Sequence, residues 1–162
     1  LPRGEVLGLT RAYTTRHGAG PLPTEDPALL AVAEPFNGTG VYQGGWRTGH
    51  LDLVVLGYAV AAIGGVDALA VSHLDVVDDP AQPAVRAVGS YETAAGVTDR
   101  LPVGPARDLV HQAALTSLLR GATGRGRELA GSRDAVVTLE RALGAPARVL
   151  AFGPDRTDRK VA

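Results

Sequence analysis

The chain has 162 residues, of which 45% are hydrophobic, and a formal net charge of −1 at pH 7. This balance suits one domain, or a large piece of one, and argues against a general binder of nucleic acid or of membrane surfaces. There is no cysteine, and Lys160 is the only lysine, which excludes disulfides, thiolate metal sites and a phosphate-binding loop of the Gly-rich Lys-Ser/Thr type.

The sequence contains no methionine, even at position 1, so we expect a start that is processed, trimmed or missing. No apolar run reaches the roughly 20 residues that span a bilayer. The first residues also lack the basic and apolar regions of a signal peptide. We therefore expect a cytoplasmic protein with no membrane partner.

The first half of the chain alternates between glycine-rich loops and apolar segments. The predicted elements are a strand over 6–13, a loop to about Pro27, one or two helical turns over 28–34 that stop at Pro35, and a second loop over 36–48. A helix follows over 51–62, where apolar residues recur with helical spacing. We expect Thr48 to be its N-cap, Asp52 to lie in its first turn, and Gly64 and Gly65 to end it.

The second half predicts further strands and helices. The expected elements are a strand over 67–74, a loop over 75–80, a strand over 84–91, a polar connection over 93–104, a helix from Pro105 to about Leu119, an exposed loop over 121–131, a helix from an N-cap at Ser132 to Gly144, and a strand over 147–152. His50 and His111 are interpreted as structural, because no His, Asp and Glu set shows metal-ligand spacing.

Alternation of strands with helix-sized crossovers predicts an α/β fold with a mainly parallel sheet flanked by helices. Ligands of such sheets bind beyond the carboxyl ends of the strands. Two strand ends therefore stand out as candidate sites, His73-Leu74-Asp75 and Phe152-Gly153-Pro154.

The run from Arg11 to Glu25, R-A-Y-T-T-R-H-G-A-G-P-L-P-T-E, concentrates turn residues behind hydroxyl and charged groups. On spacing alone it is either a nucleotide-site loop or an ordinary surface loop. It closely resembles a loop of the adenylosuccinate synthetase family, which carries a similar A-Y-T-T-R-x-G-x-G-P-x-P-T-E run. The resemblance implies that Thr15, Arg16, Gly18 and Gly20 shape the loop.

The segment from Gly38 to Asp52 is similar to the family's aspartate-binding loop and to the helix start that follows it. The resemblance assigns the following residues to the aspartate and nucleotide loop: Val41, Tyr42, Gln43, Gly44, Trp46 and Arg47. Aligned without gaps, the first two replace threonines, while Gly44 and Trp46 replace arginines, so that Arg47 alone keeps an arginine of the run. The Gln-Gly-x-x-Arg form looks like a shorter archaeal and phage branch, one member of which uses dGMP.

His73-Leu74-Asp75 stands where the family has Lys-Leu-Asp, and Gly153-Pro-Asp-Arg156 resembles the family's near-terminal Gly-Pro-Asp-Arg. The resemblance implies that Asp75 reads the base of the triphosphate, as a carboxylate suits paired N–H donors, and that Phe152, Gly153 and Pro154 adjoin that base. Because histidine replaces lysine at position 73, ATP remains an alternative to GTP as the phosphate donor. Taken alone, an aspartate just past a strand is more often a turn former.

The resemblance runs from about Val6 to Arg156 and implies a P-loop-NTPase-like synthetase fold, of which residues 1–162 are the C-terminal portion. It implies a ligase that joins L-aspartate to IMP with GTP, or to (d)GMP with ATP, as a homodimer. The family's catalytic groups and Mg²⁺ site belong to its N-terminal half, so we expect no catalytic or metal residue in this chain and no activity from it alone.

Two other hypotheses remain open. One is a stand-alone, non-catalytic remnant that binds a nucleotide or a full-length partner through an exposed sheet edge. The other is an unrelated small α/β binding domain that shares these loops. Monodisperse folding would favour the remnant, because half of a domain should expose apolar surface.

Overall fold

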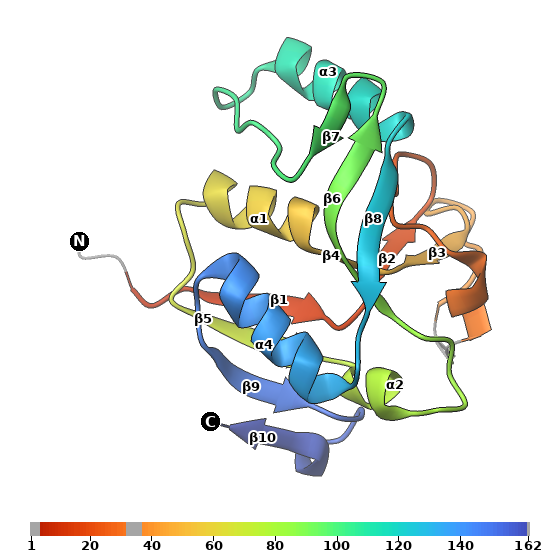
Figure 1. Cartoon of the computed structure of the whole chain (residues 1–162), viewed down its shortest axis with the longest axis vertical. Helices are drawn as coiled ribbons and strands as arrows, with labels where there is room; N and C mark the ends of the chain where they lie inside the picture. Colours follow the sequence, from red (N-terminus) through yellow and green to blue (C-terminus); the bar gives the residue numbers. More distant parts are fainter. Residues whose placement is uncertain (1–3, 32–36, 162) are drawn as a thin grey trace.

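The computed structural model describes residues 4–31 and 37–161, which form a mixed α/β fold (Figure 1). Its first sheet has the order β1-β5-β9-β10, made of β1 (Leu7–Arg11), β5 (Ala68–Ser72), β9 (Ala147–Ala151) and β10 (Arg159–Val161). The first three strands run parallel, and β10 turns back antiparallel to β9. The prediction of an α/β fold with a mainly parallel sheet flanked by helices is confirmed.

One face of this sheet is covered by helices. In β5, Leu69 and Val71 join the main hydrophobic cluster, which also contains Ala135 and Leu139 of α4 (Ser132–Leu143). The helix α4 packs on β9 and against both α1 (Leu53–Ala62) and α2 (Leu74–Asp78). Because side chains alternate along a strand, Ala70 of β5 points to the opposite face, which lines a cavity described below.

A second, smaller layer stands beside the first. It contains β4 (Leu51–Asp52), β6 (Arg86–Thr93), β7 (Gly96–Thr98), β8 (Thr123–Glu128) and α3 (Leu109–Arg120). Its hydrophobic cluster joins Val54 of α1 to Val88 and Tyr91 of β6 and to Leu115 of α3. The two layers therefore have separate cores, and α1 contributes to both.

The region predicted as an exposed loop over 121–131 is mostly the strand β8, paired antiparallel with β6. The prediction of a loop was wrong because glycines were taken as loop formers, whereas the predicted exposure holds for most of β8. A Cβ on Gly126 would lie 2.0 Å from the carbonyl oxygen of Ala87, so this glycine is needed for the close approach of the two strands. The alternating arginines Arg125 and Arg127 form ion pairs with Glu92 and Asp134.

Several element boundaries also differ from expectation. The N-cap of α1 is Asp52, whose carboxylate accepts from the backbone N–H of Val55, rather than Thr48. The helix α3 begins after the N-cap Asp108 rather than at Pro105, and Ser132 is the first residue of α4, behind Gly131.

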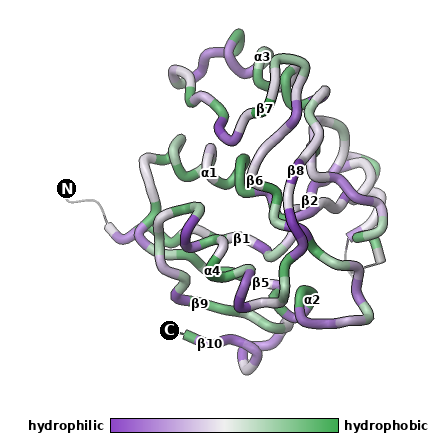
Figure 2. The backbone as a smooth tube through the Cα atoms, viewed as in Figure 1, coloured by the Kyte–Doolittle hydropathy of each residue, from purple (hydrophilic) through white to green (hydrophobic). Residues whose placement is uncertain are grey.

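Several short elements were absent from the prediction. The helix α2 occupies most of the predicted loop over 75–80, and β2 (Thr14–His17) lies within the first predicted loop, paired antiparallel with β3 (Trp46–Gly49). The segment from Gly153 to Lys160 is strongly hydrophilic (Figure 2), yet it contains a 3-10 turn, η2 (Arg156–Asp158), and leads into β10.

The helical turns predicted over 28–34 correspond to η1 (Pro27–Ala31), and the positions from 32 to Phe36 lie outside the described residues. Among the helices of the described residues, none has both the length and the hydropathy to cross a membrane.

Candidate functional site

The two predicted loops contact each other through their glycines. The backbone N–H of Gly18 donates to the carbonyl of Gly45 at 2.9 Å. Gly18 and Gly44 both have positive φ, +70° and +74°, and a Cβ on Gly18 would lie 2.6 Å from the carbonyl oxygen of Gln43. Side chains other than hydrogen would push these backbones apart, so the glycines determine the spacing of the loops.

Arg47 connects these loops from β3. Its Nε and Nη2 donate to the two carboxylate oxygens of Glu25, at 2.8 and 2.5 Å, and its Nη1 donates to the carbonyls of Gly18 and Gly20, at 3.0 and 2.8 Å. The ion pair lowers the pKa of Glu25 and raises that of Arg47. Most of this guanidinium is thus engaged in holding the loop.

The remaining residues of the predicted aspartate loop separate into two groups. The side chains of Val41 and Tyr42 project into solvent, 97% and 100% exposed, and Gln43 is exposed beside them. Trp46 instead packs inward, with its ring centroid 4.8 Å from that of His17. In the first loop, Arg16 donates to the carbonyl of Ala19, which closes the turn that Thr15 precedes.

A cavity of about 480 Å³ lies against the uncovered face of the first sheet. It brings together His73, Gly153 and Pro154, three residues of the predicted base-binding set, from the ends of β5 and β9. Its walls are largely apolar and are lined by Leu7, Leu9, Ala70, Val149 and Ala151, with Thr10, Ser72 and Arg159 at its polar side.

The other members of the base-binding set lie outside this lining. Leu74 is fully buried in the main core, and Asp75 is exposed in the first turn of α2. Phe152 packs against the main core, with the Lys160 ammonium 4.6 Å from its ring centroid. A Cβ on Gly153 would lie 2.4 Å from the carboxylate of Asp158, so this position accepts only glycine without rearrangement.

His73 has an unusual backbone. It adopts a left-handed conformation, with φ 59°, at the N-cap of α2. Its Nδ1 is 3.0 Å from the hydroxyl of Ser72, and its ring meets that of Tyr13 edge-on, with centroids 5.6 Å apart. Left-handed non-glycine residues are costly and concentrate at functional sites. The backbone of His73 therefore supports the end of β5 as a candidate functional site.

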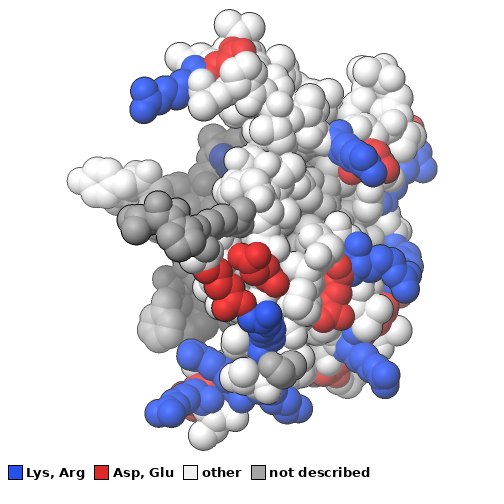
Figure 3. Space-filling model, turned by 90° about the vertical axis from the view of Figure 1, so that its left-hand side faces the viewer, with Lys and Arg blue, Asp and Glu red and all other residues white. Residues whose placement is uncertain are grey.

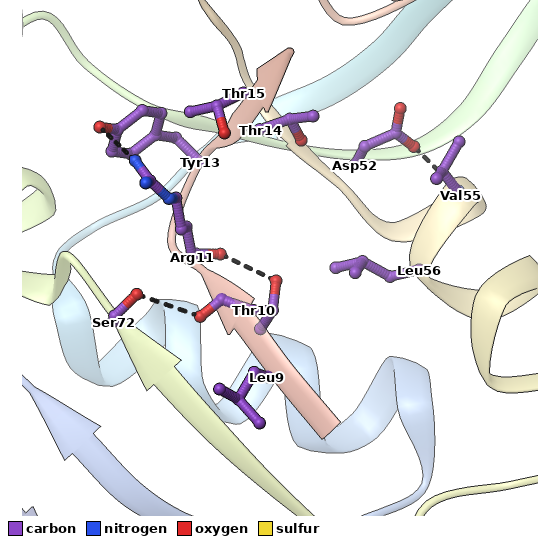
Figure 4. A pocket seen from close by; sticks show the side chains of 10 residues that line it. All are labelled: Leu9, Thr10, Arg11, Tyr13, Thr14, Thr15, Asp52, Val55, Leu56 and Ser72. Atoms are coloured by element: carbon purple, nitrogen blue, oxygen red, sulfur yellow. Dashed lines mark hydrogen bonds between the residues drawn. The ribbon is translucent and has the colours of Figure 1, made fainter. Parts of the chain in front are cut away.

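A second cavity, of about 400 Å³, lies between β1, the start of β2 and α1 (Figure 4). The residues lining it include Arg11, Tyr13, Thr14, Thr15 and Asp52. Sequence reasoning singled out Thr15 but neither Arg11 nor Asp52 as a site residue. Their positions in the sequence could have indicated them, since Arg11 ends a strand and Asp52 precedes a helix.

Asp52 is a buried carboxylate, 2% exposed. Burial raises its pKa, although hydrogen bonds from the Tyr91 hydroxyl and from the backbone of Val55 oppose that rise. Burial, together with the adjacent carboxylate, raises the pKa of Tyr91 as well. The pair therefore places a buried, hydrogen-bonded carboxyl group where the cavity meets the second core.

Charges on the molecular surface are mixed in sign. Figure 3 shows acidic and basic side chains interspersed over one face. Within residues 4–31 and 37–161, no group of three or more His, Cys, Asp or Glu side chains could hold a metal ion.

The sequence is similar to that of known adenylosuccinate synthetases. Residues 2–159 match the family model described as adenylosuccinate synthetase. The chain is 35% identical over 160 residues to the adenylosuccinate synthetase of Sorangium cellulosum, covering 93% of this chain and 36% of that protein. It is 40% identical over 104 residues to the enzyme of Acidithiobacillus ferrooxidans, covering 62% of this chain and 24% of that protein.

A solved structure supports the fold. The fully ligated adenylosuccinate synthetase from Plasmodium falciparum aligns with a TM-score of 0.74 at 19% sequence identity, over 98% of this chain and 40% of that one. The chain thus spans little more than a third of the length of its Sorangium relative.

Proposed function

The chain belongs to the adenylosuccinate synthetase family, and from this premise we propose that it forms the base-recognition and aspartate-loop part of a C–N ligase. The reaction joins L-aspartate to IMP with hydrolysis of GTP, as a step of purine nucleotide synthesis. In this proposal residues 1–162 are the C-terminal portion of a longer synthetase domain, which acts in the cytoplasm as a homodimer.

The observation that carries this proposal is the 480 Å³ cavity at the uncovered face of the first sheet. It extends along this face to the carboxyl ends of β5 and β9, where α/β proteins bind ligands. Its apolar walls suit the flat face of a purine, and His73, Gly153 and Pro154 line it together with polar residues. The close packing of Gly153 on Asp158 leaves backbone, rather than a side chain, to face a bound base.

We assign Asp75 to the edge of that base. It stands in the first turn of α2, directly beyond β5, and its exposed carboxylate is within the same strand end as His73. A carboxylate can accept two hydrogen bonds from the paired N–H donors of guanine and cannot do so from adenine. Asp75 would therefore favour GTP over ATP as the phosphate donor.

The aspartate loop is assigned to the segment from Val41 to Arg47. The exposed Val41, Tyr42 and Gln43 can reach a ligand, and the Gly18–Gly45 contact fixes the base of their loop. Arg47 contributes by holding that base, since its donors go to Glu25 and to the carbonyls of the first loop. One Nη2 hydrogen is left over for a substrate carboxylate or phosphate.

Neither phosphoryl transfer nor metal chemistry is assigned to this chain. Phosphoryl transfer needs a nucleotide-phosphate cradle and bound Mg²⁺, and the described residues offer no cluster of metal ligands. We place the Mg²⁺ site and the catalytic base in the part of the family's length that the chain does not span.

A nucleotide titration tests the base-binding role directly. We expect the chain to bind GTP more tightly than ATP in equilibrium dialysis, and we expect Asp75→Asn to remove roughly a tenfold preference. Asp99→Asn, at another exposed aspartate, is the matched control and should leave the preference unchanged. An unaltered preference in Asp75→Asn would remove Asp75 from the site, and absence of nucleotide binding would overturn the cavity assignment.

A second experiment tests the reaction and the acceptor. The gene is read upstream of the Leu1 codon, and the product of the whole reading frame is assayed with IMP, L-aspartate and GTP. Parallel assays use (d)GMP with ATP. ATP is tested as the alternative phosphate donor because His73 replaces the family's lysine. Product only from the second pair would replace the substrates proposed here, and no product from either pair would overturn the ligase.

One observation favours a non-catalytic alternative. Within the described residues β1 pairs only with β5, and Leu9 on it is 79% exposed. An exposed strand edge of this kind is a site for pairing with another polypeptide. A reading frame that starts or is interrupted just before Leu1 would favour this binding role over the ligase.

A further inference from the structure

Arg159, on β10, lines the 480 Å³ cavity and has no part in the assignments above. We propose that its guanidinium binds a second edge of the base held there, by donating to the guanine carbonyl oxygen and to the ring nitrogen beside it. This specificity role rests on the proposed function, because it needs the guanine that Asp75 is assigned to bind.

The register of β10 on β9 directs the side chain of Arg159 to the cavity. Arg159 stands opposite Ala151, and opposed residues of an antiparallel pair project from the same face of a sheet. Ala151 lines the cavity on the uncovered face, so Arg159 lies on that face as well. Lys160 alternates to the other face, where its ammonium meets the ring of Phe152.

The order of the strands places Arg159 and Asp75 on either side of β9. The strand β10 pairs with β9 at the end of the sheet, and β5 pairs with β9 on its other side (Figure 1). Asp75 follows β5, in the first turn of α2, while Gly153 and Pro154 follow the strand between them. A purine that lies across the end of β9 can therefore meet a carboxylate on one side and a guanidinium on the other.

The guanidinium of Arg159 has donors for a ligand. Its side chain is exposed, and within residues 4–31 and 37–161 it forms no hydrogen bond or ion pair. Arg148, on the neighbouring strand β9, is instead paired with Glu5. Among the described residues that line the cavity, Arg159 is also the one arginine or lysine, so a base acceptor there has this cation as its partner.

The chemistry of that edge favours guanine. Guanine presents its carbonyl oxygen and the adjacent ring nitrogen as a pair of acceptors, which matches the two-pronged donor face of a guanidinium. Adenine presents the same ring nitrogen beside an amino group, so a donor would meet a donor. Arg159 would therefore favour GTP over ATP through a contact that Asp75 does not make.

The analogue 7-deaza-GTP isolates this contact, because a C–H group replaces the ring nitrogen and the edge assigned to Asp75 is unchanged. In equilibrium dialysis the parent chain should bind GTP roughly tenfold more tightly than 7-deaza-GTP. Arg159→Met, which keeps an unbranched stem but has no donor, should bring this ratio close to one. Arg159→Lys, which keeps the charge but loses the planar fork, should give an intermediate ratio.

Arg133→Met is the matched control, at an exposed arginine of α4 on the covered side of the sheet. It should keep the ratio of the parent chain, and circular dichroism checks that each variant folds. A parent chain that does not distinguish GTP from 7-deaza-GTP, or an unchanged ratio in Arg159→Met, would overturn the proposal. Equal weakening of GTP, 7-deaza-GTP and ATP in Arg159→Met would overturn it too, because Arg159 would then contact the phosphates that all three share.

The outcome is separable from that of the proposed function. If GTP is preferred to ATP and the preference falls in Asp75→Asn, but 7-deaza-GTP binds as GTP does, only the role of Arg159 is lost. If the parent chain binds no nucleotide, the cavity assignment and the role of Arg159 are both overturned. If the ratio depends on Arg159 but the whole reading frame yields no product, the ligase is overturned and the guanine contact stands.

Discussion

The hydroxyl oxygen of Tyr91, on β6, lies 2.6 Å from each carboxylate oxygen of Asp52, the N-cap of α1. Both residues are buried, 0% and 2% exposed. Tyr91 belongs to the smaller hydrophobic cluster, while Leu51, next to Asp52, belongs to the larger one. This polar contact thus joins the side chain of Tyr91 on β6 to a residue that lines the 400 Å³ cavity.

Replacing Tyr91 by Phe should destabilise the chain by about 1–3 kcal/mol, because it removes a donor from a buried carboxylate. The measurement is urea unfolding followed by circular dichroism. Tyr58→Phe is the matched control, since the Tyr58 hydroxyl accepts from Gln112 at 3.4 Å in an exposed position, and it should cost less than about 0.5 kcal/mol. Equal losses in the two variants would show that the Asp52 contact contributes nothing specific.

Replacing Arg47 by Lys should loosen the contact between the two glycine-rich loops. Lysine cannot reproduce the two-point pairing with Glu25 together with the bonds to Gly18 and Gly20. We expect a loss of about 1–2 kcal/mol and faster proteolysis between residues 38 and 45. Arg125→Lys, in a more exposed ion pair with Glu92, should change stability little, and a protease pattern equal to that of the parent chain would count against this role of Arg47.

Replacing Gly126 by Ala should separate β8 from β6. The new Cβ would lie 2.0 Å from the Ala87 carbonyl oxygen and 2.7 Å from the Val88 Cα, both of them backbone atoms that cannot turn aside. We expect a cost of about 1–3 kcal/mol in urea unfolding. Gly89→Ala, on the partner strand, has no atom within 4 Å of its Cβ. Gly89→Ala should be neutral or slightly stabilising. A loss of stability in both variants would mean that the backbone freedom of glycine, rather than the close approach of the strands, explains the effect.

Stability should fall below about pH 6.5 because of His50. Burial lowers the pKa of this imidazole from its ordinary 6.5, against the opposing effect of Asp26 at 3.2 Å. Its Nδ1 also accepts the backbone N–H of Arg86, which requires the unprotonated ring nitrogen. The unfolded chain therefore binds a proton more readily than the folded one. The contribution is complete above pH 6.5 and is lost as pH falls toward the folded pKa, by at most about 1.4 kcal/mol per pH unit.

A comparison with His50→Asn measures this contribution, because asparagine keeps an acceptor for Arg86 but does not titrate. Urea unfolding of both proteins at about pH 7.5 and pH 5.5 brackets the interval. The parent chain should lose more stability than the variant between the two pH values. Parallel losses would mean that other groups cause the dependence.

Much of the fold follows from periodicity in the sequence. The helix α4 and the strands β5 and β9 lie where their apolar residues predict them, because each buries one side against the same core. The strand β8 was missed, since its close pairing with β6 depends on glycine backbone, and Arg125 pairs with Glu92, 33 residues away in the chain. Such pairing is determined by tertiary contacts that local composition does not encode.

The site was predictable in part. The ends of β5 and β9 meet at one cavity, as the parallel sheet requires, and His73, Gly153 and Pro154 lie together there. The engagement of Arg47 could not be deduced, because it depends on a fold that brings Glu25 and Gly18 to β3. The same holds for Arg11, whose aromatic neighbour Trp46 is separated from it by the whole first loop.

The division of apolar residues into two clusters has a consequence for motion. The smaller cluster, around Val88 and Leu115, can open while the sheet beneath α4 stays intact, because the described members of the two clusters do not overlap. Backbone amides of β6, β8 and α3 would then exchange their hydrogens for deuterium at a lower free energy than those of β5 and β9. Because Asp52 lines the 400 Å³ cavity and accepts from Tyr91, the shape of that cavity should change whenever the smaller cluster opens.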